Sequence, residues 1–124
     1  MGRSVFLVLV IVLTAARSLY AQDLKEGLAA YKRGDYATAI EQWRPLAENG
    51  HSGAQYNLGF NYVQGKGVEK DLVAAYFWFD LAARQGKRIA QRLRDGVAAS
   101  MTEAQIAEAE RRVRTWLASR TRPR

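Results

Sequence analysis

The sequence has no cysteine and a single histidine, His51, so it offers neither thiolate ligands nor a histidine cluster for a metal ion. Without cysteine, disulfides and cysteine nucleophiles are also excluded. Only 2 prolines occur in 124 residues, and 48% of the residues are hydrophobic, which is enough for a packed core. A chain of this length holds one small domain. Enzymes built from two large lobes around a cofactor are therefore excluded.

The polar residues do not form a recognisable catalytic set. His51 lies between Gly50 and Ser52 with no nucleophile or orienting acid nearby, which is typical of a turn residue. Gly65-Lys66-Gly67-Val68 lacks the Gly-Lys-Ser/Thr ending of a phosphate-binding loop. The spacing of five carboxylates predicts exposed helix faces and caps: Glu41, Glu48, Glu69, Asp71 and Asp80. We therefore predict a protein that is not an enzyme and has no cofactor or metal site.

The N-terminal segment has the three-part layout of a secretory signal peptide. A positive start containing Arg3 precedes an unbroken apolar run, Val5–Leu13, and Ala21 supplies the small residue for cleavage. The run is shorter than the roughly 20 residues of a membrane span. We expect residues 1–21 to be removed and the mature protein to be exported, either periplasmic or secreted. The alternative is a membrane anchor formed by uncleaved residues 4–20.

The remaining chain contains two partial copies of one pattern. A shift of 36 residues superposes their small and aromatic positions: Ala39 on Ala75, Trp43 on Phe79, Ala47 on Ala83 and Gly50 on Gly86. A shift of 31 residues is needed earlier in the pattern, where Gly34 meets Gly65. The difference predicts a five-residue insertion at 66–70 in the second copy. Repeats of this length are typical of paired helices.

Apolar periodicity and capping residues predict six helices after residue 21 and no strand. Gly65 and Gly86 are expected to end helices, and Asp71 and Ser52 to cap the N-termini of the helices that follow them. The stretch Thr102-Glu103-Ala104-Gln105 is a capping box that opens a final helix. The predicted helices with defined bounds are 24–33, 36–49, 72–85 and 102–119, and a further helix is expected between Ser52 and Gly65.

Residues 54–86 resemble the Sel-one-like repeat family, a relative of the tetratricopeptide repeats. The matching positions are Ala54, Leu58-Gly59, Tyr62, Gly65, Gly67-Val68, Asp71, Ala75, Trp78, Ala82-Ala83 and Gly86. Residues 24–50 resemble a shorter, tetratricopeptide-like copy. The resemblance implies an all-α fold, a short α-α superhelical solenoid of helix pairs with a C-terminal helical cap. The predicted division is 1–21 signal peptide, 22–50 first helix pair, 51–86 Sel-one-like repeat, 87–119 capping helix pair and 120–124 basic tail.

The resemblance also implies a groove lined by the first helix of each pair. On the helix predicted between Ser52 and Gly65, Tyr56, Phe60 and Val63 form an apolar strip that is either packing between repeats or groove wall. If it is groove wall, Asn57 and Gln64 at its edge could hydrogen-bond a bound peptide. The candidate partner-binding residues are therefore Tyr56, Asn57, Phe60 and Gln64.

The positive charge is concentrated at the C-terminal end. The chain carries a formal net charge of +7, and residues 84–124 contain 11 Lys or Arg against 4 Asp or Glu. This excess either is a solvated face or binds an anionic partner, with candidate residues Arg88, Arg92, Arg111, Arg112 and Arg114.

Two functions follow, both non-enzymatic. The first is an interaction scaffold of the cell envelope that binds a protein or peptide in the groove. The alternative is an electrostatic binder of anionic lipid or polysaccharide surfaces through the basic cap. Nucleic acid is an unfavourable partner for an exported protein. Self-association is compatible with a stack this short, because about three repeats are usually needed for stability.

Overall fold

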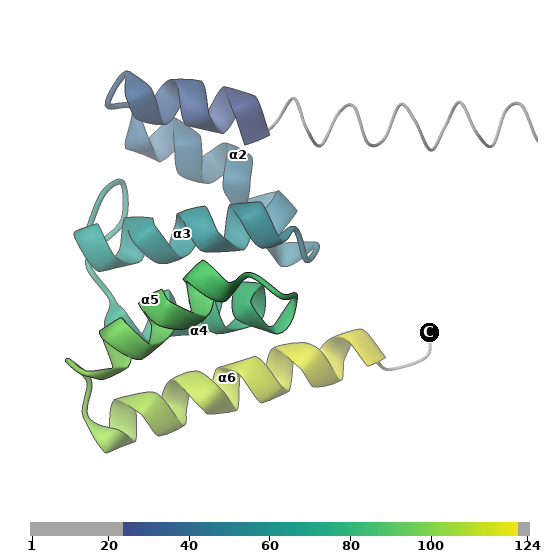
Figure 1. Cartoon of the computed structure of the whole chain (residues 1–124). Helices are drawn as coiled ribbons and strands as arrows, with labels where there is room; N and C mark the ends of the chain where they lie inside the picture. The colour runs from purple at the N-terminus through teal and green to yellow at the C-terminus, as the bar shows by residue number, and fades with distance from the viewer. Residues whose placement is uncertain (1–23, 122–124) are drawn as a thin grey trace, which may run out of the picture.

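The computed structural model describes residues 24–121, which fold as six helices without a strand (Figure 1). The first helix covers residues 24–32. The others are α2 (Tyr36–Glu48), α3 (Ser52–Gln64), α4 (Leu72–Arg84), α5 (Arg88–Ala98) and α6 (Glu103–Thr121). The predicted all-α class is confirmed. The predicted signal peptide lies outside the described residues, as does most of the predicted basic tail.

The helices stack in the order of the sequence, from the helix over 24–32 to α6 at the opposite end (Figure 1). α3 packs against both α2 and α4, and α4 also packs against α5 and α6. In Figure 1 the helix over 24–32, α3 and α5 face the viewer, and α2 and α4 lie behind them. The molecule is therefore a short helical-repeat solenoid with two distinct faces, which we call the front and the back.

The superposition predicted from the sequence places equivalent residues at equivalent depths. Ala39 and Ala75 are both fully buried, and Trp43 and Phe79 are 2% and 0% exposed. The predicted insertion at 66–70 is the loop between α3 and α4. The two copies are therefore structural repeats of one helix pair, because the same positions fill the core in both.

The helix ends follow the predicted capping chemistry, with one exception. Asp71 accepts a hydrogen bond from the Ala74 amide at 3.0 Å, and Gly65 ends α3 with a positive φ of 66°. Thr102 and Gln105 exchange the two hydrogen bonds of a capping box, at 2.9 and 3.1 Å. Ser52, which we expected to cap α3, instead begins that helix.

His51 is the residue that caps α3. Its Nδ1 accepts a hydrogen bond from the Ala54 amide at 3.1 Å. Histidine is an unusual N-cap, so the sequence favoured the serine beside it. The only histidine of the chain is thus a structural turn residue in the described part of the protein.

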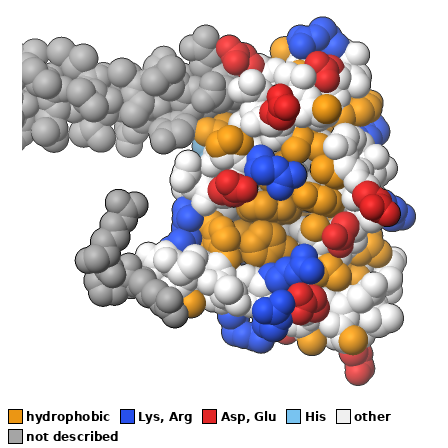
Figure 2. All heavy atoms as spheres, turned by 180° about the vertical axis from the view of Figure 1, so that it is seen from behind, with side chains coloured by type: hydrophobic (Ala, Val, Ile, Leu, Met, Phe, Trp, Pro, Cys, Tyr) orange, Lys and Arg blue, Asp and Glu red, His pale blue; other side chains and the backbone are white. Residues whose placement is uncertain are grey.

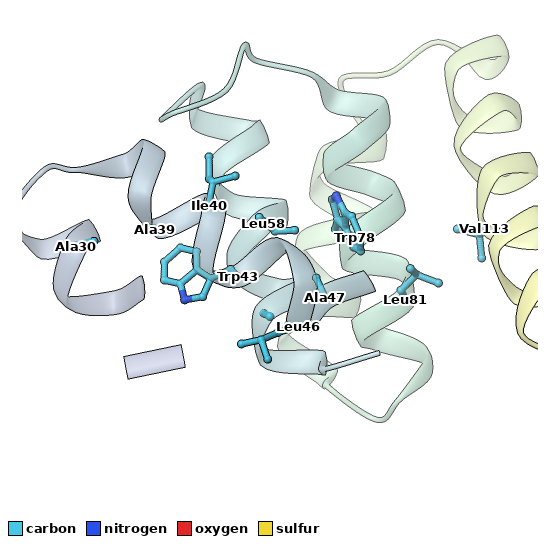
Figure 3. Close-up of a cluster of buried hydrophobic side chains, with 11 residues drawn as sticks. Ala30, Ala39, Ile40, Trp43, Leu46, Ala47, Leu58, Trp78, Leu81 and Val113 are labelled. Atoms are coloured by element: carbon cyan, nitrogen blue, oxygen red, sulfur yellow. The ribbon is translucent and has the colours of Figure 1, made fainter. Parts of the chain in front are cut away.

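Two clusters of buried side chains hold the stack together. The first joins five helices through residues such as Trp43, Leu58, Trp78 and Val113 (Figure 3). The second, around Phe79, joins α3 to α5 and α6. Close approach in the second cluster requires Gly59, because a Cβ atom there would come within 2.5 Å of the Phe79 ring. The absence of a side chain at Gly59 therefore allows α3 and α4 to pack closely.

The prediction of an exposed Asp80 is wrong. Asp80 is 3% exposed, and its carboxylate is bound by Arg94 Nη1 at 2.6 Å and Arg84 Nε at 2.8 Å. Arg94 belongs to α5, so this ion pair ties α5 to α4. An acidic residue on an otherwise apolar helix was buried because a partner 14 residues later in the chain neutralises it.

Candidate interaction groove

A hollow of about 270 Å³ opens on the front between the helix over 24–32 and α3. Asn57, Phe60 and Gln64, three of the four predicted partner-binding residues, line it from α3. Leu28 lines the opposite wall and is 43% exposed. Asn61 of α3 lines it as well, so the hollow is an apolar slot with three side-chain amides on one wall.

A second hollow, of about 340 Å³, lies between α3 and α5. Phe60 lines this hollow too, so one ring forms the ridge between both. Leu93 and Arg92 line it from α5, with the Arg92 guanidinium adding positive charge. The two hollows therefore lie side by side on the front, separated by Phe60. We call them together the front groove, defined by Leu28, Asn57, Phe60, Gln64, Arg92 and Leu93.

The apolar strip of α3 both packs between the repeats and forms groove wall, the two roles between which the sequence did not decide. Phe60 packs edge-on against Phe79, with the ring centroids 5.6 Å apart, and also lines the groove. Tyr56 lies against Phe60 and Phe79 and beneath the Lys87 ammonium, 5.9 Å from its ring centre. Tyr56 does not line either hollow, so its contribution to the groove is to support Phe60.

A polar network borders the first hollow. The Tyr31 hydroxyl donates to Gln64 Oε1 at 3.2 Å and accepts from Lys66 Nζ at 3.4 Å. Lys66 also lies over the rings of Tyr31 and Tyr36. The Tyr31 hydrogen bond is the largest influence that raises the pKa of Lys66, so the ammonium stays charged. This border gives the groove a hydrogen-bonding edge and a fixed positive charge.

Sequence reasoning missed the groove residues of the first helix pair. Leu28, Tyr31 and Trp43 line the hollow opposite α3. Tyr31 and Tyr62 are equivalent under the shift of 31 residues, which marks Tyr31 as a repeat position. This equivalence does not indicate that Tyr31 lines a groove. Leu28 lies opposite Phe60 only because the helix over 24–32 and α3 line the same hollow in the folded stack.

The five arginines predicted to bind anions lie on two helices. Arg88 and Arg92 belong to α5, and Arg92 lines the front groove. Arg111 and Arg112 belong to α6 and line a different hollow, which α2, α3, α4 and α6 enclose. Arg114 is exposed on α6. Their anion-binding role stays a prediction.

On α6, Glu108 partly neutralises this group. Hydrogen bonds from Arg111, at 2.7 and 2.8 Å, and from Arg112, at 2.9 Å, lower the pKa of the Glu108 carboxyl to about 2. One carboxylate therefore serves two guanidinium groups at neutral pH, which leaves one positive charge unmatched within this trio.

Neither membrane spans nor metal-binding clusters were found within residues 24–121. None of the helices in this range is long and apolar enough to cross a bilayer. The same range holds no group of three or more His, Cys, Asp or Glu side chains arranged to bind a metal ion.

These observations define a helical repeat protein with an open groove on its front face. Residues 52–87 match the family model of the Sel1 repeat, the family that the sequence pattern of residues 54–86 resembles. The match covers α3, α4 and the turn after them. Sel1 repeats generally mediate protein–protein interactions and are typically non-catalytic scaffolds.

Several curated proteins are similar to part of the chain. The exopolysaccharide production negative regulator of Rhizobium leguminosarum bv. viciae is 39% identical over 62 residues, which cover 50% of this chain and 23% of that protein. Its namesake from Rhizobium meliloti (strain 1021) is 37% identical over 62 residues, with the same coverage. The rat DAP3-binding cell death enhancer 1 is 40% identical over 49 residues, 40% of this chain and 10% of that protein. The match to the rhizobial proteins thus spans about a quarter of their length.

Proposed function

We propose that this chain is a non-enzymatic interaction module of the cell envelope that binds a segment of a partner protein in the front groove. The observation that carries the proposal is the position of Phe60, which lines two neighbouring hollows and is flanked in the first by the amides of Asn57 and Gln64. Apolar pockets separated by a ridge can take alternate side chains of one peptide. Side-chain amides can pair with its backbone N–H and C=O groups.

The repeat match and the relatives support a protein partner. Sel1 repeats generally mediate protein–protein interaction, and the rat relative is named for binding a protein. The groove walls are preformed by buried neighbours such as Trp43 and Phe79, so binding requires little reorganisation of the helices.

A photo-crosslinking amino acid at Leu28 should capture a discrete partner in cells that make the full chain natively. Leu28 is exposed in the groove, so its side chain is accessible to a bound segment. The double change Asn57→Ala and Gln64→Ala should reduce the adduct about tenfold or more, because two hydrogen bonds to the partner are lost. Mass spectrometry of the adduct would identify the partner.

The matched controls separate groove binding from general stickiness. The same crosslinker at Ala107, an exposed position on α6, should give no such adduct. Gln91→Ala removes an exposed amide that lines neither hollow and should leave the adduct unchanged. If the double alanine variant keeps its helical circular dichroism and its adduct, the groove is not the binding site.

The envelope location follows from the N-terminal pattern and is part of the same proposal. The mature protein recovered from periplasmic or culture fractions should begin at Gln22, as determined by mass spectrometry of its N-terminal peptide. An intact N-terminus in a membrane fraction would support the uncleaved anchor over residues 4–20. Electrostatic binding to anionic lipid or polysaccharide remains the alternative function.

A further inference from the structure

The back of the molecule carries a hollow of about 580 Å³ that the proposed groove does not use. Its floor is aromatic and combines Tyr62 of α3 with Phe77 of α4 and Trp116 of α6. Figure 2 shows hydrophobic side chains gathered at the middle of this face, with charged side chains around them. We call it the back hollow: Arg44, Tyr62, Phe77, Arg111, Arg112 and Trp116.

Positive charge surrounds this aromatic floor. Arg44 of α2 lines one side, and Arg111 and Arg112 of α6 line another. In the part of the chain that the structure describes, Arg44 forms no ion pair, and its Nη2 donates to the Tyr62 hydroxyl at 3.3 Å. Arg111 and Arg112 share the single carboxylate of Glu108. Two of the three guanidinium charges are therefore unmatched.

We propose that the back hollow is a second binding site, which takes an acidic peptide segment carrying an apolar side chain next to its carboxylates. The apolar side chain would lie on the Phe77 and Tyr62 rings. The carboxylates would pair with Arg44 on one side and with Arg112 on the other, because an arginine fork binds a carboxylate with two parallel hydrogen bonds. This inference does not depend on the front groove.

The ring faces favour a peptide over a polysaccharide. Sugar rings bind by stacking on open aromatic faces, but the Arg120 guanidinium lies over the Trp116 ring, 4.0 Å from its centre. Arg120 is held there by its hydrogen bond to the Glu48 carbonyl, at 2.7 Å. Trp78, also at this hollow, is only 6% exposed. The Trp116 ring is therefore already covered by a guanidinium, which disfavours a stacked sugar, whereas an apolar side chain needs only the smaller Phe77 and Tyr62 rings.

The test uses the full chain and a fluorescein-labelled peptide in which glutamate alternates with leucine and phenylalanine, with binding measured by fluorescence anisotropy. Arg44→Gln should weaken binding about tenfold, the loss expected when a charge-assisted hydrogen-bonded pair is removed. Arg88→Gln is the matched control, because it removes the same charge from an exposed position outside the hollow. It should change the affinity less than about twofold, since distant surface charges are screened.

Matched probes and a groove variant identify the site. A peptide with glutamine in place of glutamate should lose binding, and so should one with serine in place of the apolar residues. The Asn57→Ala and Gln64→Ala variant should bind the acidic peptide normally, because both residues lie in the front groove. This last result would also distinguish binding in the back hollow from binding in the front groove.

Several results would overturn the proposal. Absence of binding by the acidic, apolar peptide would do so. So would equal losses with Arg44→Gln and Arg88→Gln, which would show an effect of net charge only. Displacement of the peptide by polygalacturonate at equal carboxylate concentration would assign the hollow to an acidic polysaccharide. Loss of binding in the groove variant would place the peptide on the front.

Discussion

Replacement of Trp78 by alanine is expected to lower the free energy of unfolding by about 3–5 kcal/mol, the range for truncating a large buried aromatic residue. Trp78 is 6% exposed and belongs to the first buried cluster. In the view of Figure 3 it lies between Leu58 of α3 and Val113 of α6. Its removal would therefore loosen the contacts of α4 with both neighbours.

Urea unfolding followed by circular dichroism measures this loss, since a fluorescence signal would change with the tryptophan itself. The expected loss is a large part of the roughly 5–15 kcal/mol that stabilises a small domain. Ile89→Ala is the control, because Ile89 is 49% exposed and surface changes usually stay within about 0.5 kcal/mol. Should Trp78→Ala unfold at the same urea concentration as the unaltered protein, the buried role of this ring would be disproved. Trp78→Phe should give an intermediate loss and covers the case in which the alanine variant does not fold.

Replacement of Asp80 by alanine is expected to destabilise the protein by about 3 kcal/mol, the low end of the range for removing one partner of a buried ion pair. Arg94 would be left without its main acceptor, with its side chain only 21% exposed. The low end applies because Arg94 keeps Asp95, whose carboxylate lies 3.0 Å from Nη2. The same urea titration measures the effect.

Two further variants isolate the ion pair. Arg84→Ala removes the more exposed partner, 54% exposed, and should have an effect of about 1 kcal/mol or less. Asp80→Leu combined with Arg94→Met replaces the pair by apolar side chains and should recover part of the loss, since no buried charge is left unpaired. A double variant as unstable as Asp80→Ala would show that the carboxylate acts through something other than Arg94.

The repeat architecture could be predicted from the sequence because its signals are local. Gly65 ends a helix through its own backbone angle, and Asp71 caps the next helix through a hydrogen bond only three residues away. Thr102 and Gln105 likewise satisfy each other within one turn. Such features are fixed by spacing along the chain, and each of them was found where the spacing predicted it.

The candidate sites were only partly predictable, because they depend on which helices meet. Asn57, Phe60 and Gln64 were found from one face of one helix. Leu28 and Arg92 complete the groove from helices before and after it, and no periodicity within α3 indicates them. Arg111 and Arg112 of the back hollow were among the predicted anion-binding residues, but the hollow itself was missed, since Arg44 and Arg112 lie 68 positions apart in the sequence.

By itself, the sequence determined that this protein is a stack of helix pairs with small residues at the contacts and without cysteine chemistry. Capping, periodicity and the repeat were sufficient, because each acts over one or two helical turns. Only the tertiary structure decided that Asp80 is buried, that Phe60 separates two hollows, and that arginines of α2 and α6 face a common aromatic floor. Those outcomes depend on which helices meet in the folded stack, because these contacts bring together residues that no local spacing relates.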